Sequence, residues 1–296
     1  NDNEQKFDQQ INELSDVQSI ALNQIKDQLI NKDVVLLDGV TSSGKTEIYI
    51  KLIEGYLKLG KQVLYLLPEI SLTTQIIQKL KINFGNQISV FHSRYSLNER
   101  TDVWESIRKN KKSARLIVGA RSSVFLPFSD LGLIIVDEEH ETSYKQQEPS
   151  PRYNARDAVI YLSKLNNSKV VLGSATPSIE STNNAKNDKY GFVQLSDRYG
   201  KVKMPNIIPL DMRNEPKNTY SSIFSEKLVQ EINNCLALDK QVILFRNRRG
   251  YSPQWICNSC GQNVACDNCD VSLTYHLSSN MLKCHYCGFS SMAESK

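Results

Sequence analysis

One stretch of the chain has the residue types and the spacing of a phosphate-binding loop. Residues 39–46 read Gly-Val-Thr-Ser-Ser-Gly-Lys-Thr, which fits the pattern G-x-x-x-x-G-K-T. The glycines let several backbone N–H groups point at one phosphate, and the positive end of a following helix adds to the attraction. Lys45 would reach the β- and γ-phosphates, and the Thr46 hydroxyl would bind Mg²⁺. The expected nucleotide-binding residues are Gly39, Thr41, Ser42, Ser43, Gly44, Lys45 and Thr46.

Two adjacent carboxylates, Asp137 and Glu138, follow the apolar run at residues 131–136. An acid at this place holds Mg²⁺ in P-loop nucleotide hydrolases, so we expect Asp137 to bind the metal. We expect Glu138 to orient and deprotonate the attacking water, because successive residues at a strand end point in different directions. Lys45, Asp137 and Glu138 are therefore the predicted catalytic residues. An acidic loop in solvent over residues 137–141 is the alternative.

Six of the seven cysteines form three Cys-x-x-Cys pairs. Each pair can present two thiolates to one ion, and a structural zinc takes four ligands. Three pairs thus complete one zinc site and leave one pair over, and spacing alone does not decide which pairs combine. Cys235 lies on a predicted helix and is expected to be a small buried apolar residue. The predicted zinc ligands are Cys257, Cys260, Cys266, Cys269, Cys284 and Cys287.

The elements that must position these residues alternate between strand-like and helix-like segments. This alternation predicts an α/β fold with a mostly parallel sheet covered by helices. Ligands of such sheets bind beyond the carboxyl ends of the strands, where the polar stretches at 39–46, 137–140 and 173–177 fall. The stretch 188–222 is rich in Pro, Asn, Asp and Gly and is expected to be a linker. The expected strands are 34–38, 62–67, 87–91, 115–118, 131–136, 169–172 and 241–245, and the expected helices include 14–30, 72–84, 97–110 and 224–238.

Composition and charge favour a cytoplasmic protein with a polyanionic partner. A hydrophobic content of 40% over 296 residues supports a sizeable core, and the net charge of +4 favours a partner such as nucleic acid. No run approaches the ~20 apolar residues that span a bilayer, and no signal peptide is visible, so no membrane is expected. A P-loop without a secretion signal favours a reducing compartment, where paired cysteines hold metal. Because the chain begins with Asn1, we expect it to be a piece of a longer protein.

Several stretches together resemble the motor motifs of superfamily 2 helicases. They are residues 39–46, Asp-Glu-Glu-His at 137–140 and Gly-Ser-Ala-Thr-Pro at 173–177. Three further stretches narrow the resemblance to the PriA family of bacterial primosomal helicases, which restart stalled replication forks. These are Pro-Glu-Ile-Ser-Leu-Thr at 68–73, Ser-Tyr-Lys-Gln-Gln-Glu at 143–148 and Asn-Arg-Arg-Gly-Tyr at 247–251. The resemblance runs from about Leu14 to the last residue.

The resemblance implies a RecA-like motor that hydrolyses ATP with Mg²⁺ and moves 3′ to 5′ on forked and single-stranded DNA. It implies primosome proteins and single-stranded-DNA-binding proteins as partners. It makes Gln18 the adenine reader and residues 143–157 an aromatic-rich loop that couples DNA binding to hydrolysis. Tyrosines of that loop can stack on bases, while Lys145, Arg152 and Arg156 can meet phosphates. The predicted DNA-binding residues are Arg121, Tyr144, Lys145, Arg152, Tyr153 and Arg248.

The resemblance also implies an arrangement for the zinc ligands. It supplies a fourth cysteine pair beyond residue 296 and a crossed pattern, first pair with fourth and second with third. On that pattern the pairs at 266/269 and 284/287 close one Zn²⁺ site, and the pair at 257/260 is half of another, which His276 would complete poorly. Sequential pairing, with the pairs at 257/260 and 266/269 together, is the alternative that the spacing leaves open.

The family pattern divides the chain into four parts. Residues 1–12 are a linker, 13–200 a first RecA-like lobe, 201–252 a linker and the start of a second lobe, and 253–296 an incomplete zinc module. Relative to the family, we expect an N-terminal DNA-binding domain and most of the second lobe, with its arginine finger, to be missing. The alternatives are an RNA helicase and a non-catalytic zinc-ribbon adaptor. Glu138 beside Asp137 argues against the adaptor, because an architectural nucleotide fold needs no acid that activates water.

Overall fold

The computed structural model describes residues 14–68, 74–92, 95–198, 200, 205–211, 224–245, 255, 263–285 and 287–293, apart from the side chains of 269–271. The chain divides into two compact units, Asn1–Pro205 and Asn206–Lys296, and each is described by itself. Four earlier predictions lie outside the described residues: the linker at 1–12, the DNA contact Arg248 and the zinc ligands Cys257 and Cys260.

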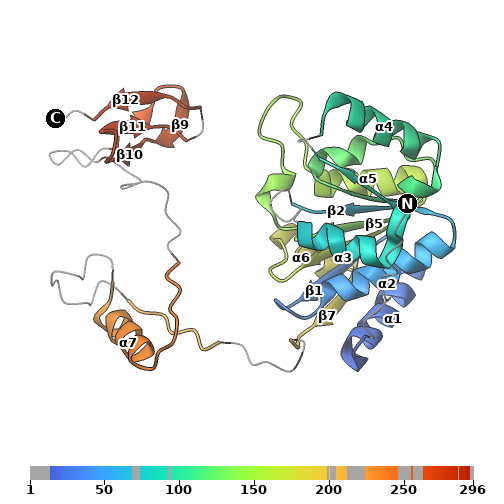
Figure 1. Ribbon diagram of the computed structural model, residues 1–296, viewed down its shortest axis with the longest axis horizontal. Coiled ribbons are helices and arrows are strands. Elements are labelled where there is room, and N and C mark those ends of the chain that lie inside the picture. The colour runs from blue at the N-terminus through green and yellow to red at the C-terminus, as the bar shows by residue number, and fades with distance from the viewer. Residues whose placement is uncertain are drawn as a thin grey trace, which may run out of the picture. The chain divides into compact units, whose positions relative to one another are not determined.

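The first unit is built on a seven-stranded sheet in the order β3-β4-β2-β5-β6-β1-β7 (Figure 1). Every neighbouring pair of strands is parallel, so all seven carboxyl ends lie at one edge. The central strands are apolar on both faces, as expected for a sheet covered on both sides. The predicted α/β fold with a parallel sheet is therefore confirmed. The strands are β1 Val34–Gly39, β2 Gln62–Leu66, β3 Ile88–Phe91, β4 Leu116–Gly119, β5 Leu131–Asp137, β6 Lys169–Ser174 and β7 Gly191–Leu195.

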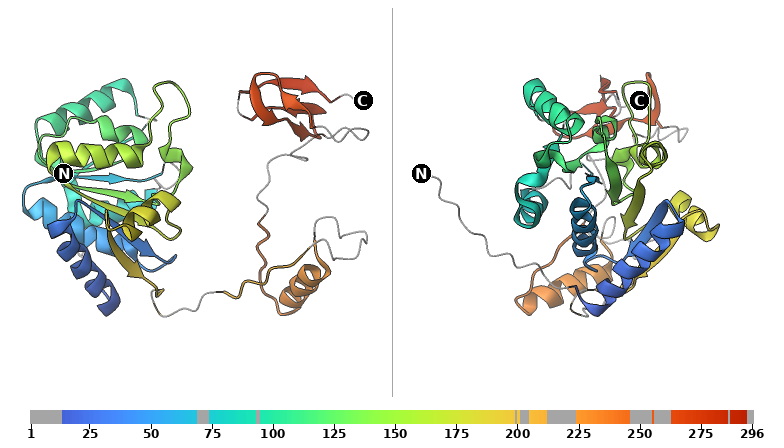
Figure 2. Two further views of the ribbon diagram at one scale, coloured as in Figure 1. Left: turned by 180° about the vertical axis from the view of Figure 1, so that it is seen from behind. Right: turned by 90° about the vertical axis from the view of Figure 1, so that its right-hand side faces the viewer.

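Helices flank both faces of the sheet (Figure 2). One apolar core lies on each face. Helices α1, α2 and α3 pack with Val35 and Leu37 of β1, whereas α4 and α5 share the other core with Leu36. Alternate strand residues point to opposite faces, which divides each strand between the two cores. The helices are α1 Asp16–Asn31, α2 Lys45–Lys58, α3 Thr74–Phe84, α4 Leu97–Arg108, α5 Ala155–Asn166 and α6 Ile179–Lys186, with short turns η2 Gly85–Gln87, η3 Lys112–Ala114, η4 Arg121–Phe125 and η5 Thr142–Tyr144.

Side chains cap the first turn of four of these helices. Ser15 accepts a hydrogen bond from the Gln18 N–H at the start of α1, and the Gln18 side chain accepts one from the Ser15 N–H. The N-caps of α4, α5 and α6 are Ser96, Asn154 and Ser178. Helix α2 differs, because its N-cap is Gly44 and no side chain caps it. The uncapped first turn of α2 lies at the phosphate-binding loop.

The described residues of the second unit form one helix and a small group of short strands. Helix α7 spans Glu226–Ala237, and none of its residues is buried; Cys235, which we expected to be buried, is half-buried. Five strands follow, and Leu273 and Tyr275 pack with two cysteines in a small apolar cluster. None of the described helices has the length and apolar character needed to cross a bilayer. The strands are β8 Ala265–Cys266, β9 Cys269–Ser272, β10 Thr274–His276, β11 Met281–Lys283 and β12 Ser290–Met292.

Two predictions of local structure are wrong. Within the stretch 188–222, expected to be a linker, residues Gly191–Leu195 form β7 at the edge of the sheet. The apolar Phe192 occupies an exposed position, so the sequence does not alternate clearly between apolar and polar residues, although Val193 and Leu195 enter the core. Residues 241–245 form no strand, and Ile243 and Phe245 are 93% and 87% exposed. No described strand pairs with that segment, so its apolar residues have no sheet against which to pack.

Candidate functional site

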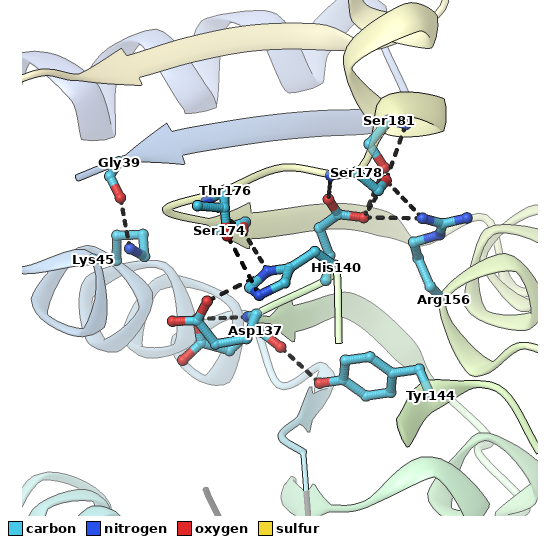
Figure 3. Close-up of polar contacts among 12 residues, drawn as sticks. Gly39, Lys45, Asp137, His140, Tyr144, Arg156, Ser174, Thr176, Ser178 and Ser181 are labelled. Carbon is cyan, nitrogen blue, oxygen red and sulfur yellow. Dashed lines mark hydrogen bonds and ion pairs between the residues drawn. The ribbon is translucent and has the colours of Figure 1, made fainter. Parts of the chain in front are cut away.

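The phosphate-binding loop connects the carboxyl end of β1 to the start of α2. Gly44 has φ +83°, a left-handed conformation that glycine adopts without steric cost. Lys45 Nζ donates to the Gly39 carbonyl at 2.7 Å, within the loop (Figure 3). Ser43 Oγ is buried and has no hydrogen-bond partner among the described residues. The loop thus combines an uncapped helix N-terminus, an unpaired buried hydroxyl and an ammonium group.

Gln18, which we expect to read adenine, lies against this loop. Its Nε2 donates to the Ser43 carbonyl at 3.1 Å, and its Oε1 accepts from the Ser15 N–H at 2.9 Å. A Cβ atom on Gly44 would lie 2.1 Å from Gln18 Nε2, so the glycine makes room for the amide. The amide oxygen is thus engaged in the cap of α1, and one N–H of the amide remains to contact a ligand.

A cavity of about 430 Å³ opens beside Gln18 and Ser43. The segment after β7 also lines it, with Asp197 and Arg198. Arg198 donates from Nη2 to Thr41 Oγ1 of the phosphate-binding loop at 3.0 Å. Arg198 is a residue that the sequence analysis missed, because its stretch reads as a polar linker. The only available signal was its position after an apolar segment that proves to be β7.

Asp137 ends β5 and accepts hydrogen bonds on both carboxylate oxygens. The Tyr49 hydroxyl and the Glu138 N–H donate to Oδ1 at 3.3 and 3.1 Å, and the Tyr65 hydroxyl donates to Oδ2 at 3.2 Å. Burial, followed by repulsion from Glu138, raises the pKa of Asp137 to about 6, while the charge of Lys45 opposes that shift. The positive charge of Lys45 therefore acts on the Asp137 carboxylate at the edge of the sheet where both residues lie.

Glu138 turns the chain away from the end of β5. Its φ of +47° lies in the left-handed region, which a residue other than glycine rarely adopts. Its carboxylate is partly exposed and lies 3.6 Å from Nδ1 of His140. The strained backbone therefore directs Glu138 to the open edge of the sheet, while Asp137 stays buried.

His140 connects the end of β5 to the stretch that follows β6. Its Nδ1 lies 2.7 Å from Ser174 Oγ, and its Nε2 lies 3.4 Å from Thr176 Oγ1 (Figure 3). The Thr176 N–H also donates to Ser174 Oγ at 2.9 Å. The Asp-Glu-Glu-His and Gly-Ser-Ala-Thr-Pro stretches are thus joined directly by side chains.

A buried ion pair joins the same two stretches to α5. The Glu139 side chain has no exposed surface, and its Oε2 accepts from Arg156 Nη1 at 3.2 Å. Ser178 donates to Glu139 from its N–H at 2.6 Å and from its hydroxyl at 3.0 Å, and the Ser181 hydroxyl donates at 2.8 Å. Arg156, which we expected to meet DNA phosphate, is therefore engaged inside the protein. Sequence reasoning missed this role of Glu139, since nothing in the pattern distinguishes it from its acidic neighbours.

Tyr144, predicted to stack on a DNA base, is a core residue. Its ring is 1% exposed, and its hydroxyl donates to the carbonyls of Asp137 at 2.7 Å and Leu66 at 3.2 Å. A ring enclosed on all sides offers no face to a base, so this prediction is wrong. The aromatic-rich loop is also shorter than the expected 143–157, because α5 begins at Ala155.

The other predicted DNA contacts in the first unit lie together on an outer surface. Lys145 and Arg152 are exposed, and an isolated bridge between Lys145 and Asn154 closes their loop. Arg121 braces the loop by donating from Nη1 to the carbonyls of Ser143 and Lys145 at 3.1 and 3.2 Å.

The Tyr153 ring of this loop packs edge-on against Phe125 of η4, with ring centroids 4.8 Å apart. Phe125 is largely exposed and was not predicted. The pair places two aromatic rings at the base of the loop that carries Lys145 and Arg152.

Three of the predicted zinc ligands lie together in the second unit. The Sγ atoms of Cys266, Cys284 and Cys287 are all within 4.8 Å of one another, and those of Cys266 and Cys287 are 3.5 Å apart. Such a set of thiols fits Zn²⁺, which takes four ligands at about 2.3 Å from sulfur. The grouping joins the second Cys pair to the third, as the crossed arrangement requires and sequential pairing does not. His276 lies against His285 instead, with their Nε2 atoms 3.0 Å apart.

Comparison with known proteins agrees with this geometry. Residues 15–185 match the DEAD/DEAH box helicase family, and residues 266–291 match the Cys-rich region domain of PriA DNA helicase. Replication restart protein PriA of Bacillus subtilis (strain 168) is 45% identical over 277 residues, which cover 93% of this chain and 34% of that protein. The same protein of Haemophilus influenzae is 45% identical over 256 residues, covering 86% and 34%. The chain thus spans about a third of the length of these curated relatives.

Among solved structures, the helicase MrfA bound to DNA aligns with 62% of this chain and 27% of its own, at 16% identity and a TM-score of 0.46. The family match is the stronger finding, because it spans more than half of the 296 residues and includes the P-loop and the Asp-Glu-Glu-His stretch. The chain therefore belongs to the DEAD/DEAH box helicase family, and within that family it is similar to replication restart protein PriA.

Proposed function

We propose that the chain forms the first motor lobe and a zinc-binding module of an ATP-dependent DNA helicase that acts in replication restart. One observation carries the proposal: the P-loop and the Asp137-Glu138 pair lie at one edge of a parallel sheet, separated by a single strand, in a chain similar to replication restart proteins. Following the family resemblance, we extend it to cytoplasmic action, 3′-to-5′ movement, remodelling of forked DNA, and partnership with primosome and single-stranded-DNA-binding proteins.

The residues of the P-loop fit a nucleotide phosphate. The free backbone N–H groups at the uncapped N-terminus of α2 can bind an anion. The buried Ser43 Oγ has no hydrogen-bond partner among the described residues and can bond to a phosphate oxygen. In our proposal Lys45 moves its ammonium from the Gly39 carbonyl to the phosphates, and Thr46 and Asp137 hold Mg²⁺. When bound, this ion would neutralise charge that develops on the phosphates.

Glu138 is the residue that we assign to the attacking water. Its carboxylate is partly exposed at the open edge, and its left-handed backbone is the kind of strain that clusters at functional sites. His140, 3.6 Å away, would hold the carboxylate and connect it to Ser174 and Thr176. Through this connection, the stretch after β6 would respond to the state of the nucleotide.

We assign the cavity beside Gln18 to the adenine base. The second N–H of the Gln18 amide can donate to a ring nitrogen without breaking the cap of α1. Arg198 also lines this cavity and already contacts Thr41 of the P-loop. The guanidinium group can stack on a base, as arginine does on planar rings.

We assign single-stranded DNA to the surface formed by Lys145, Arg152, Tyr153 and Phe125. Exposed cations beside aromatic rings are the combination that holds a DNA strand without reading its sequence. Arg121 would act by bracing the loop through its carbonyl contacts. The buried Glu139–Arg156 pair then connects the end of this loop with the nucleotide edge.

In the second unit we assign Zn²⁺ to Cys266, Cys269, Cys284 and Cys287. Three of these thiols already lie together, and Cys269 is the remaining member of the Cys-x-x-Cys pair that begins with Cys266. Its side chain lies outside the described residues.

The test is the ATPase activity of the full-length protein that contains this chain, measured with forked DNA, single-stranded DNA and RNA. We expect both DNA substrates to stimulate hydrolysis and RNA to have little effect. Lys45→Ala should abolish turnover, whereas Glu138→Gln should abolish turnover and leave ATP binding intact. Equal stimulation by RNA would favour an RNA helicase, and a full-length protein that hydrolyses no ATP would favour an adaptor.

A further inference from the structure

Two buried tyrosines enclose the carboxylate of Asp137. Tyr49 comes from α2 and donates to Oδ1 at 3.3 Å, and Tyr65 comes from β2 and donates to Oδ2 at 3.2 Å. Each oxygen thus receives one phenol hydroxyl, from a different element of the fold. The Glu138 N–H adds a third donor at 3.1 Å. The carboxylate therefore cannot rotate without losing a hydrogen bond on each side.

The tyrosines themselves are enclosed by the core. Both are among the largest fully buried side chains, and their rings pack in a T-shape with centroids 5.7 Å apart and an angle of 64°. A buried phenol hydroxyl without a hydrogen-bond partner costs free energy. Each tyrosine hydroxyl is therefore stabilised by its bond to Asp137, as the carboxylate is by the two hydroxyls. The two rings and Asp137 therefore form one rigid group.

Gly173 provides the space in which this group fits. It ends the apolar part of β6 and is the register partner of Asp137 in β5. A Cβ atom at this position would lie 1.7 Å from the Tyr49 hydroxyl and 2.9 Å from Cζ of the same ring. Any side chain larger than hydrogen would push Tyr49 from Asp137. Glycine is thus required at position 173 because Tyr49 of α2 occupies the space that a side chain would fill.

We propose that Tyr49 and Tyr65 are positioning residues, which fix the Asp137 carboxylate in the one orientation that suits a nucleotide-bound Mg²⁺. The inference rests on the proposed function, since it needs a Mg²⁺-nucleotide at the P-loop. Carboxylates that bind metals are commonly held by such outer hydrogen bonds, and losing one typically reduces metal affinity 10–100-fold. The two tyrosines would otherwise serve only the core, and that role predicts no effect on Mg²⁺.

The test measures how much Mg²⁺ strengthens nucleotide binding by this chain. The affinity for a fluorescent, non-hydrolysable ATP analogue is determined by anisotropy, once with Mg²⁺ and once with EDTA. For Tyr49→Phe and Tyr65→Phe we expect the ratio of the two affinities to fall about tenfold, with the affinity in EDTA unchanged. Tyr56→Phe is the matched control, because Tyr56 lies on α2 and donates no hydrogen bond to Asp137 among the described contacts. Thermal melts followed by circular dichroism report any loss of stability separately.

Gly173→Ala provides a second, independent measurement. In the unmodified chain it should lower the Mg²⁺ ratio as Tyr49→Phe does, and in the Tyr49→Phe background it should lower the ratio little further. An unchanged ratio in both tyrosine variants would overturn the inference and return the pair to a role in packing. If the unmodified chain bound no ATP analogue at all, the proposed function itself would fail, and this inference with it.

Discussion

Three consecutive carboxylates at the end of β5 have three different environments. Asp137 is buried among phenol hydroxyls, Glu138 is strained and partly exposed, and Glu139 is enclosed with Arg156 and two serines. Successive residues of a strand point to opposite faces, which separates the side chains of Asp137 and Glu138. The chain turns at Glu138, and the side chain of Glu139 then enters the protein. The same chemical group can therefore bind metal, activate water and hold the fold together.

At Glu139 this difference predicts a large effect on stability. Among the described ion pairs, Glu139→Ala would remove the one fully buried partner of the Arg156 guanidinium, which would keep only Asp157 at 3.0 Å and Glu180 at 3.8 Å, both largely exposed. Removing one member of a buried ion pair costs about 3–5 kcal/mol when the remaining charge is left unpaired, and the contact with Asp157 places the expected loss at the lower end of that range. Urea unfolding of this chain measures that loss. Glu180→Ala is the matched control, since Glu180 also approaches Arg156 Nη1, at 3.8 Å, but is largely exposed and should change stability by less than about 1 kcal/mol. Equal losses would show that the burial of Glu139 contributes nothing.

At the scale of elements, the aromatic-rich loop is a short strap between η5 and α5. Arg121 and the Lys145–Asn154 bridge fix its two ends, so its exposed side chains project from a defined base. Tyr144 belongs to that base and not to the exposed part, since it anchors η5 to β2 and β5 through two carbonyls.

The exposed residues of the loop and the buried Tyr144 are predicted to differ in their effect on DNA binding. In the full-length protein, the triple variant of Lys145, Arg152 and Tyr153 to alanine should lose most DNA stimulation of the ATPase. Each stacking contact is worth about 1–3 kcal/mol by alanine substitution, and each cation adds attraction to phosphate. Tyr144→Phe should keep the stimulation, because the hydroxyl that it removes faces the core. If DNA still stimulated the ATPase activity of the triple variant, the DNA would bind at a surface other than this loop.

Sequence patterns predicted the central elements well because those elements are long, apolar and bounded by glycine or polar residues. The P-loop, the strands that end at Asp137 and Ser174, and the parallel sheet all follow from such runs. The edge strand β7 escaped prediction because the apolar Phe192 lies at an exposed position between Gly191 and Val193, which hides the alternation of its burial. Tyr144 was misassigned for a different reason: composition does not reveal whether an aromatic residue near a strand end points inward. The partners of Glu139 lie 17 to 42 residues away, and no local pattern contains that information.

At the scale of the whole chain, every residue that we assign to ATP belongs to the first unit, which is built on one parallel sheet. Among the described residues beyond 206 there is no second parallel sheet, only α7 and the short strands. In helicases the arginine that stabilises the transition state comes from a second lobe, and such a residue is worth about 10³–10⁵ in rate. A polypeptide of these 296 residues should therefore bind Mg-ATP but hydrolyse it slowly. Single-turnover hydrolysis with and without single-stranded DNA is the measurement, and fast DNA-stimulated turnover would contradict the prediction.

The zinc content of the whole chain tests the arrangement of its cysteines. In our proposal Cys269 joins the clustered Sγ atoms of Cys266, Cys284 and Cys287 as the fourth ligand of one site, so the chain purified under reducing conditions should hold one tightly bound zinc. Cys284→Ser should release that zinc, because a structural site that loses one of four thiolates is no longer closed. Cys257→Ser should retain it, since in the crossed arrangement Cys257 belongs to a different site. Metal analysis by mass spectrometry after dialysis against EDTA reads both outcomes. If zinc were lost from Cys257→Ser and kept by Cys284→Ser, the pairs would combine in sequence, and the cluster of three thiols would not be the binding site.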